Sequence, residues 1–371
     1  MRSSTPYNKV PQRLCSPWLS RLMLGLGVLM LAIEGTWSIP VHASTAFGVY
    51  IILLMLLLCV QISRFRFGAV WLSHVGMLLV LAGSLLGASG RIPCRMKLRV
   101  NEAGSIAYTV DKSAVQLPFT IALDKFETEY YANDQEAPKQ FRSYLKIDGK
   151  QMTTEVNAPA RYMGYSIYQD GYDTLNGQYS ILKFVHDPWL PAVYAGMALL
   201  AVAAFLLLLN HWNLKVILPV VILIAVLFTL FSVARINFQT LMPVLRSWWF
   251  VPHLGMYMIA YAIVAVAVIV TFFNARLARE LMRSASGLIL LGMLMGSVWA
   301  NQAWGDYWGW DPKENWAAVT WMLMLMCMHV RDAGRWKITM YVLLTFVALQ
   351  ITWYGVNYLP SAVNSLHTYN S

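Results

Sequence analysis

Aromatic side chains crowd into residues 304–316, WGDYWGWDPKENW, between two long apolar segments. Tryptophan and tyrosine gather where one end of a ring is dry and the other is wet. Rings interleaved with glycine and charge could form a platform for a large planar ligand, with Lys313 or Asp306 at its rim. The same run would also fit an interfacial aromatic belt that leads into a capped helix.

Four of the seven histidines could bind such a ligand through a metal ion. His253 lies at the mouth of one apolar segment and His367 in the C-terminal tail, so this pair flanks the aromatic run. His74 lies eight residues after Arg66 and His329 two residues before Arg331, so this second pair lies on the other side of the membrane from the first. Two imidazoles on opposite faces make a bis-histidine haem site, and an aromatic wall between axial ligands suits a porphyrin.

Each histidine taken alone has a simpler interpretation. A single histidine inside a membrane often hydrogen-bonds a neighbouring helix, and one in a polar tail often has no role. Two pairs at two depths favour haem binding over these alternatives. We interpret the remaining three, His42, His186 and His211, as structural.

The elements that position these residues are membrane spans. The 371-residue chain is 58% hydrophobic and 12% charged, which is too apolar for a soluble protein. We expect an all-α polytopic membrane protein with about nine transmembrane helices and one small β-rich extracytoplasmic domain inserted after helix 3. The expected spans are about 19–33, 47–62, 70–88, 189–209, 216–233, 252–273, 287–300, from the aromatic run to 330, and 338–356, with an amphipathic piece at 236–249.

The basic residues indicate the orientation of these spans. Lysine and arginine resist translocation, so the gaps that hold them should be cytoplasmic. Thirteen fall in gaps on one side and three in short gaps on the other. The first side holds Arg2, Lys9, Arg13, Arg21, Arg64, Arg66, Lys215, Arg276, Arg279, Arg283, Arg331, Arg335 and Lys337, and the second holds Arg235, Arg246 and Lys313. The N-terminus is therefore expected in the cytoplasm, and the aromatic run and C-terminus outside. The net charge of +10 is explained by topology rather than by nucleic acid.

Local patterns predict details of structure. In residues 90–188 apolar residues alternate with polar ones, as at 96–100 and 119–123, and Asp148-Gly149 is a hairpin signal. Asp311, Pro312 and Glu314 predict a helix start with a capping box. The glycine pairs 83/87 and 292/296 have the spacing of close helix contacts. Tyr257 and Tyr261 share a helix face with His253, either as packing or as the edge of a haem site.

The four cysteines, Cys15, Cys59, Cys94 and Cys327, contain no CxxC or CxxCH motif. The chain is therefore neither a dithiol redox protein nor itself a c-type cytochrome. The first apolar segment is longer than a signal-peptide core and lacks a small-x-small cleavage site, so we expect it to be retained.

The aromatic run resembles the tryptophan-rich motif of the CcsA family of System II cytochrome c assembly, in the form WGxYWxWDPKExW with Trp321 beyond. The first half is similar to CcsB, also called ResB, at His74-Val-Gly76, Leu81-Ala-Gly83-Ser84, Tyr165–Gln169, Asp187-Pro188 and Tyr194-Ala-Gly196. The resemblance implies a natural CcsB–CcsA fusion. Its parts would be CcsB-like helices 1–3 in residues 1–89, the β-rich domain in 90–188, CcsB-like helix 4 in 189–212, and a CcsA-like domain in 213–371 whose haem-handling loop is 301–321.

The resemblance also implies a function, a haem lyase of the holocytochrome c synthase type. Such proteins, in the bacterial cytoplasmic membrane, export haem b and present its vinyl groups to the CxxCH thiols of apocytochrome c. The outer axial ligands would be His253 and His367, and the inner ligands His74 and His329. The loop residues at the haem would be Trp304, Trp308, Trp310, Asp311 and Trp316. A separate thiol reductase would be a partner. Two alternatives stay open: a haem exporter or chaperone without ligation activity, and a haem-b electron-transfer subunit.

Overall fold

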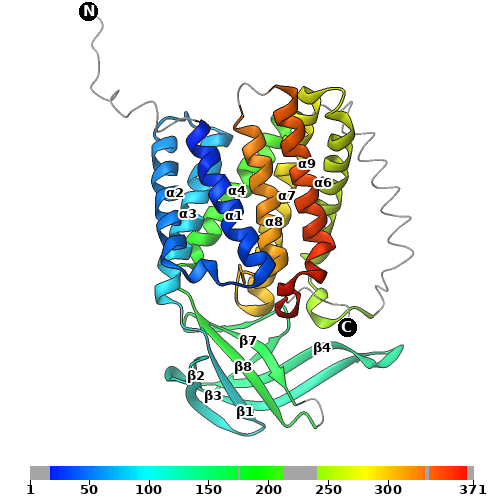
Figure 1. The fold of residues 1–371 in the computed structure, drawn as a ribbon. Helices are drawn as coiled ribbons and strands as arrows, with labels where there is room; N and C mark the ends of the chain where they lie inside the picture. Colours follow the sequence, from blue (N-terminus) through cyan, green and yellow to red (C-terminus); the bar gives the residue numbers. More distant parts are fainter. Residues whose placement is uncertain (1–16, 174–175, 212–239, 331–333, 366–371) are drawn as a thin grey trace, which may run out of the picture.

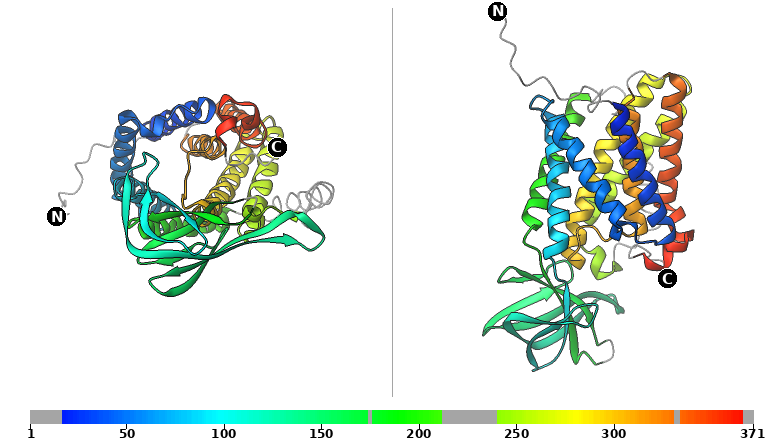
Figure 2. Two further views of the ribbon diagram at one scale, coloured as in Figure 1. Left: turned by 90° about the horizontal axis from the view of Figure 1, so that it is seen from below. Right: turned by 60° about the vertical axis from the view of Figure 1, so that its left-hand side comes forward.

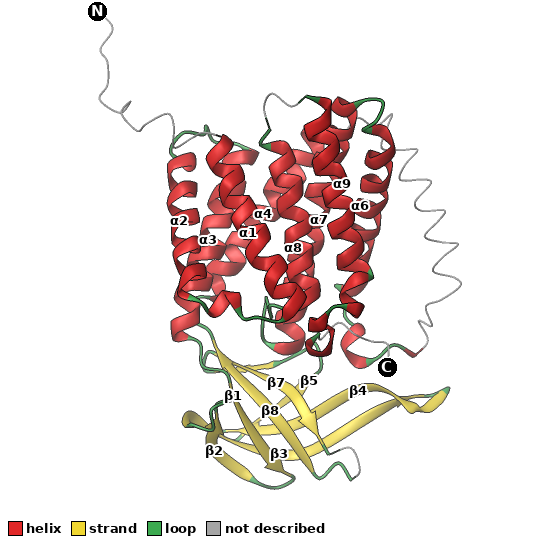
Figure 3. Cartoon of the chain, viewed as in Figure 1, coloured by secondary structure: helices red, strands yellow, loops and turns green. Residues whose placement is uncertain are grey.

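The computed structural model describes residues 17–173, 176–211, 240–330 and 334–365. It consists of a bundle of helices above a separate layer of strands (Figure 1, Figure 3). We call the end of the bundle next to the strands the outer end, and the opposite end the inner end. The span expected at 216–233 and the candidate ligand His367 lie outside the described residues.

In the described residues, eight long helices form the bundle, and each coincides with an apolar run of the sequence. They are α1 (Pro17–Trp37), α2 (Thr45–Ile62), α3 (Ala69–Gly90), α4 (Leu190–His211), α6 (Phe250–Val270), α7 (Ala275–Trp304), α8 (Pro312–Met328) and α9 (Arg335–Trp353). Within the described ranges, all of these except α8 are long and apolar enough to cross a membrane, which makes seven. Large apolar side chains such as Leu53 and Phe205 are more than half exposed, as expected of lipid-facing helices. The predicted multi-helix membrane fold is confirmed, but the count of nine spans is not.

One expected boundary was wrong. Arg276, Arg279 and Arg283 were expected in a turn, but they lie on the first turns of α7, which has 30 residues. At 1.5 Å per residue this helix is about 45 Å long, longer than a hydrocarbon core of about 30 Å, so it can carry charge at its inner end. The described part of the amphipathic piece expected at 236–249, residues 240–249, contains the short 3-10 helix η4 (Pro243–Leu245).

The strands form one antiparallel sheet of eight, in the order β5-β4-β3-β2-β1-β8-β7-β6. They are β1 (Cys94–Arg99), β2 (Ala103–Tyr108), β3 (Ala114–Tyr131), β4 (Asp134–Ile147), β5 (Lys150–Glu155), β6 (Ala160–Tyr162), β7 (Tyr165–Tyr172) and β8 (Tyr179–His186). The predicted alternation is confirmed, because Met96, Leu98 and the residues at 119, 121 and 123 are buried together. The hairpin signal is confirmed too: Asp148 and Gly149 have φ of 47° and 84° between β4 and β5.

The sheet curls so that strands far apart in its order meet. Thr154 on β5 donates to the carbonyl of Ile167 on β7 at 2.7 Å, and Ser143 on β4 donates to the Gln169 side chain at 2.6 Å. The domain is therefore a barrel-like layer rather than a flat sheet. Viewed along the bundle axis, it lies across one side of the outer end and leaves the ends of α1 and α9 uncovered (Figure 2).

The strand layer enters and leaves the bundle through two tightly packed helices. Helix α3 runs into β1, and β8 runs into α4. A Cβ on Gly76 of α3 would lie 2.8 Å from the carbonyl oxygen of Gly196 on α4, so both glycines are needed for this approach. The paired helices fix where the strand layer sits relative to the bundle.

Candidate functional site

The tryptophan-rich run forms the loop between α7 and α8 at the outer end. Helix α7 ends at Gly305, whose φ of 82° is left-handed. A Cβ there would lie 2.9 Å from the Tyr168 ring of β7, so glycine lets the loop pack against the sheet. The predicted capping box is confirmed: the Asp311 side chain accepts from the N–H of Lys313 at 2.8 Å, and Glu314 accepts from the N–H of Asp311 at 3.3 Å.

The first half of this loop is fastened to α3 and the strand layer. Asp306 pairs with Arg91, which directly follows α3, at 2.5 Å and with Lys183 of β8 at 2.8 Å. The same two cations donate to backbone carbonyls of the loop, at 2.6 Å and 2.7 Å. The hydroxyl of Tyr307 donates to Ser84 of α3 at 3.1 Å. The loop is therefore anchored to residues more than a hundred positions away in the sequence.

The environment of Asp306 explains its charge. Burial alone would raise the pKa of this carboxyl, but Lys183 and Arg91 more than offset that effect and hold the pKa below its ordinary value. Asp306 is consequently an anion at neutral pH, committed to its two cations. It was expected at the rim of a ligand platform, and the structure places it in an anchoring role.

The second half of the loop packs against α1 and α2. Trp310 has a left-handed φ of 57°, and Asn315 of α8 donates to its carbonyl at 3.0 Å. The His42 ring stacks on its indole at a centroid distance of 4.6 Å and an interplanar angle of 4°. Trp308 and Trp316 belong to the same apolar cluster. His42 was expected to be structural. A sequence signal for its position is Glu34, an acid that lies in the last turn of α1.

The outer candidate His253 lies in the first turn of α6. Its Nδ1 is 2.8 Å from the carbonyl oxygen of Gly292 on α7. Because a carbonyl only accepts, Nδ1 carries the proton and Nε2 carries the lone pair, the arrangement found in metal-binding histidines. The centroid of its ring lies 5.0 Å from that of Tyr257 and 6.0 Å from that of Trp299. Its expected partner, His367, lies outside the described residues.

Trp299 connects His253 with the tryptophan-rich loop. Its ring centroid lies 6.2 Å from that of Trp304, and its indole N–H is shared between Asn157 at 3.2 Å and the carbonyl of Val244 at 3.1 Å. An aromatic path thus runs from His253 to the start of the loop. Sequence reasoning missed Trp299 because it falls inside an apolar span, where tryptophan attracts no notice.

The glycines of α7 shape the seat of His253. A Cβ on Gly296 would lie 2.7 Å from Cε1 of His253, and one on Gly292 would lie 2.8 Å from the Tyr257 ring. These glycines were expected to pack helices together. They do so beside the candidate iron ligand His253, so a larger residue at either glycine must displace the ring of His253 or Tyr257.

The two inner candidates lie at the other end of the bundle, on α3 and at the end of α8. His74 lies in the second turn of α3, and His329 caps α8. Each ring places Nδ1 on the carbonyl four residues earlier, Val70 at 2.7 Å and Leu325 at 2.8 Å. Both therefore present Nε2 as the lone-pair atom, as His253 does.

Arg279 of α7 braces the end of α8 beside His329. It donates to the carbonyls of Met328 at 2.9 Å and Val330 at 2.6 Å, the residues on either side of that histidine. The helix end thereby gains partners for orphan carbonyls. The arginine expected in a cytoplasmic turn is thus part of the inner candidate site.

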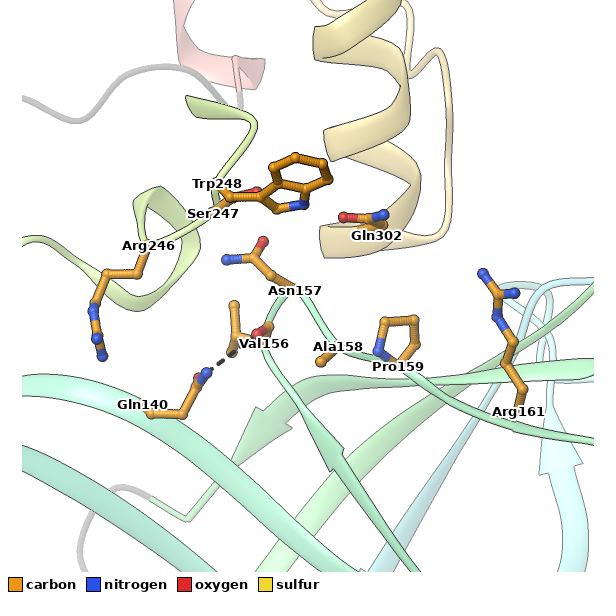
Figure 4. Close-up of a pocket in the computed structure, with 10 residues that line it drawn as sticks. All are labelled: Gln140, Val156, Asn157, Ala158, Pro159, Arg161, Arg246, Ser247, Trp248 and Gln302. Atoms are coloured by element: carbon orange, nitrogen blue, oxygen red, sulfur yellow. Dashed lines mark hydrogen bonds between the residues drawn. The ribbon is translucent and has the colours of Figure 1, made fainter. Parts of the chain in front are cut away.

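A cavity of about 490 Å³ lies between the strand layer and the outer ends of the helices (Figure 4). It is lined by Gln140, Val156, Asn157, Ala158, Pro159, Arg161, Arg246, Ser247, Trp248 and Gln302. A second cavity of about 230 Å³ shares Val156 and reaches Trp304. Both spaces border the residues that hold Trp299, so they lie on the outer side of the His253 site.

Several buried indole N–H groups have no hydrogen-bond partner in the described part of the chain. They belong to Trp249, next to the His253 turn, and to Trp316 and Trp321 on α8. A buried donor without a partner is costly and indicates a missing group. These three N–H groups could each donate a hydrogen bond to a polar ligand.

Comparison with protein families matched two regions. Residues 63–183 match the ResB-like family, and residues 189–363 match the family described as Cytochrome C assembly protein. The chain joins a ResB-like region to a cytochrome c assembly region. This composition is consistent with a CcsB–CcsA fusion. His74, Arg91 and Lys183 belong to the ResB-like region, whereas His253, His329 and the tryptophan-rich loop belong to the assembly region.

Relatives of the assembly region include the cytochrome c biogenesis protein CcsA of Hordeum vulgare and that of Zea mays. Each is 42% identical over 87 residues, which is 23% of this chain and 26% of the relative. The chain thus spans about a quarter of the length of the curated relatives it matches. The membrane fold and the two matched families agree with the predicted resemblance.

Proposed function

We propose that the chain carries haem b across the bacterial cytoplasmic membrane and presents it for covalent attachment to the CxxCH motif of apocytochrome c. The observation that supports this most is shared by three candidate histidines. His74, His253 and His329 each turn Nδ1 toward a backbone carbonyl and present Nε2 as the lone-pair atom. They lie at both ends of the bundle, as a transport path requires.

At the inner end, His74 and His329 would receive haem from the cytoplasm. One imidazole comes from the ResB-like region and the other from the assembly region. Haem bound between them would bridge the two regions, with Arg279 holding the end of α8 in place. Both rings are oriented before the ligand arrives, which lowers the ordering cost of binding.

At the outer end, His253 and His367 would hold the iron beside the loop tryptophans 304, 308, 310 and 316. Trp299 packs against both His253 and Trp304, so it supports a single site that includes the histidine and the start of the loop. Arg246, which lines the larger cavity, or Lys313 would pair with a propionate. Asp311 would act indirectly, by capping α8 and fixing the loop.

The attachment step needs positioning more than acid–base chemistry from the protein. Each thiol adds across one vinyl group: a sulfur–carbon bond forms and the thiol hydrogen passes to the neighbouring carbon, so no oxidant is consumed. The cysteines among the described residues, Cys59, Cys94 and Cys327, form no disulfide with one another. Because the chain has no CxxC motif, a different protein, a thiol reductase, would keep the substrate thiols reduced. The chain's share is to orient the vinyl groups and exclude water.

The test is the absorption spectrum of the purified full-length protein. We expect a low-spin bis-histidine spectrum that is lost in H253G and in H367G and partly restored by added imidazole. H186G is the matched control and should keep the wild-type spectrum, because this β8 ring packs against Tyr165 and Gly164 of the strand layer. An unchanged spectrum in both outer variants would remove them as iron ligands.

A second assay separates ligation from export alone. The chain is coexpressed with a CxxCH reporter and a thiol reductant in cells that lack other assembly systems. Covalent haem on the reporter is the expected result. Haem bound to the chain with none attached to the reporter would leave it an exporter or chaperone, and quinol oxidation by the purified protein would favour an electron-transfer subunit.

A further inference from the structure

The outer end of α1 carries a carboxylate that the proposed pathway does not use. Glu34 is only 4% exposed. Its carboxylate accepts from the backbone N–H of His42 at 3.0 Å and bonds Nδ1 of the same residue. A charged group inside a membrane span is costly and is kept where it has a partner and a role. Here the partner is a histidine on the short 3-10 helix η2 (Val41–Ala43).

The His42 ring packs against the tryptophan-rich loop rather than against a neighbouring span. Its ring is parallel to the Trp310 indole at 4.6 Å, while Phe47 of α2 meets the same indole edge-on at 5.3 Å. Trp310 has a left-handed backbone, which a bulky residue keeps only if its surroundings enforce it. His42 and Phe47 hold the ring from two sides, and Asn315 holds its carbonyl.

The same end of α1 also contacts the helix that follows the loop. A Cβ on Gly35 would lie 2.9 Å from Trp316 of α8, and the Ser361 hydroxyl, on the 3-10 helix η6 (Pro360–Asn364), donates to the Gly35 carbonyl at 2.6 Å. Glu34 and Gly35 thus lie where α1 packs against α8 and η6. A shift of this point would move the second half of the loop.

We propose that Glu34 and His42 form a positioning pair that fixes the Trp310 indole in the haem platform. The inference rests on the proposed haem-binding function. His42 acts through Trp310, because its Nδ1 is engaged by the carboxylate and its face by the indole. Carboxylates often orient the imidazoles of metal ligands. Here Glu34 orients the His42 imidazole, and His42 in turn positions the Trp310 indole.

The test compares haem affinity of purified full-length H42A, H42F, E34Q and E34D with wild type and with the control H186A. H42A should lose several-fold, up to roughly tenfold, the upper range for one aromatic contact. H42F keeps a stacking ring and should lose less, and E34D should recover part of what E34Q loses. The low-spin spectrum should be unchanged in all of them, since the iron ligands remain.

A double-mutant cycle decides whether His42 acts through Trp310. H42A should cost nothing further in a W310A background. Additive losses, or wild-type affinity in both H42A and E34Q, would overturn the proposal. A change to a high-spin spectrum in H42F would also overturn it, by making His42 an iron ligand.

The apoprotein separates this proposal from the proposed function. If the wild type takes up no haem, the proposed function fails by itself. The emission of Trp310, isolated as the difference between wild type and W310F, must still change in H42A if the imidazole covers the indole. Identical difference spectra would show that the ring is not held there and would refute the positioning pair.

Discussion

Replacing Asp306 with asparagine keeps the size of the side chain and removes the charge that anchors the tryptophan-rich loop. In the wild type this carboxylate faces Arg91 at 2.5 Å and Lys183 at 2.8 Å. The lysine side chain is 11% exposed and the arginine 20%, so neither cation gains full solvation when its partner is lost. D306N therefore leaves two poorly hydrated cations beside a neutral amide.

The magnitude follows from this geometry. Removing one partner of a buried pair costs roughly 3–5 kcal/mol. Asp306 itself is 32% exposed, which weakens the pair, and both cations keep a loop carbonyl as acceptor. We expect a loss of about 2 kcal/mol. With an unfolding entropy of about 2.1 cal/mol/K per residue, a chain of this length should melt roughly 3 °C lower.

The pH dependence of that loss is set by the pKa of Asp306. The folded-state pKa lies below the ordinary value of 3.8, because the two cations outweigh burial. A group with a depressed pKa stabilises the fold fully above its unfolded pKa and loses this contribution as pH falls through the folded pKa. The difference between wild type and D306N should therefore be constant from neutral pH down to about 5 and shrink only in stronger acid.

The assay is thermal unfolding of the detergent-purified protein across pH. D170N is the control, because Asp170 of β7 pairs with the half-exposed Arg95 of β1. The control should shift the melting temperature by less than half as much. The reasoning is refuted if D306N melts with the wild type at neutral pH, or if the difference grows in acid.

Two further substitutions test the seats of the histidines. G296A should displace the His253 ring, whose Cε1 would lie 2.7 Å from the new Cβ, and lower haem content at least several-fold; G255A, where no atom lies within 4 Å, should leave it unchanged. R279Q should free the end of α8 and weaken haem binding at the inner site, seen as a loss of His329-dependent absorbance, while the outer-site spectrum persists.

Features that depend on neighbouring residues were predictable from the sequence. The apolar runs located α1 to α4 within a few residues, and the capping box at Asp311 and Glu314 followed from residue types alone. The hairpin at Asp148-Gly149 was of the same kind. The start of α7 was missed because its arginines look like a loop when charge is taken as the sign of a gap, although a long helix carries them on one end.

Features that depend on distant residues were not predictable. The anchors of the loop come from Arg91 and Lys183, and its stacking partner from His42, each more than a hundred residues away. No local pattern marks a lysine in a strand as the partner of an aspartate in a membrane loop. Trp299 was invisible for a related reason, since its role lies in contacts with His253 and Asn157 rather than in its neighbours.

These anchors give a physical reason for joining the two regions in one chain. The loop belongs to the assembly region, but its first half is held by Arg91 and Lys183 of the ResB-like region, and its second half by Glu34 and His42, which precede that region. The assembly region alone would keep the capping box and lose both lateral supports. The haem platform that we propose for this loop would need such supports to hold a planar ligand within a fraction of an ångström. In a single chain they are present at a fixed ratio and a high effective concentration.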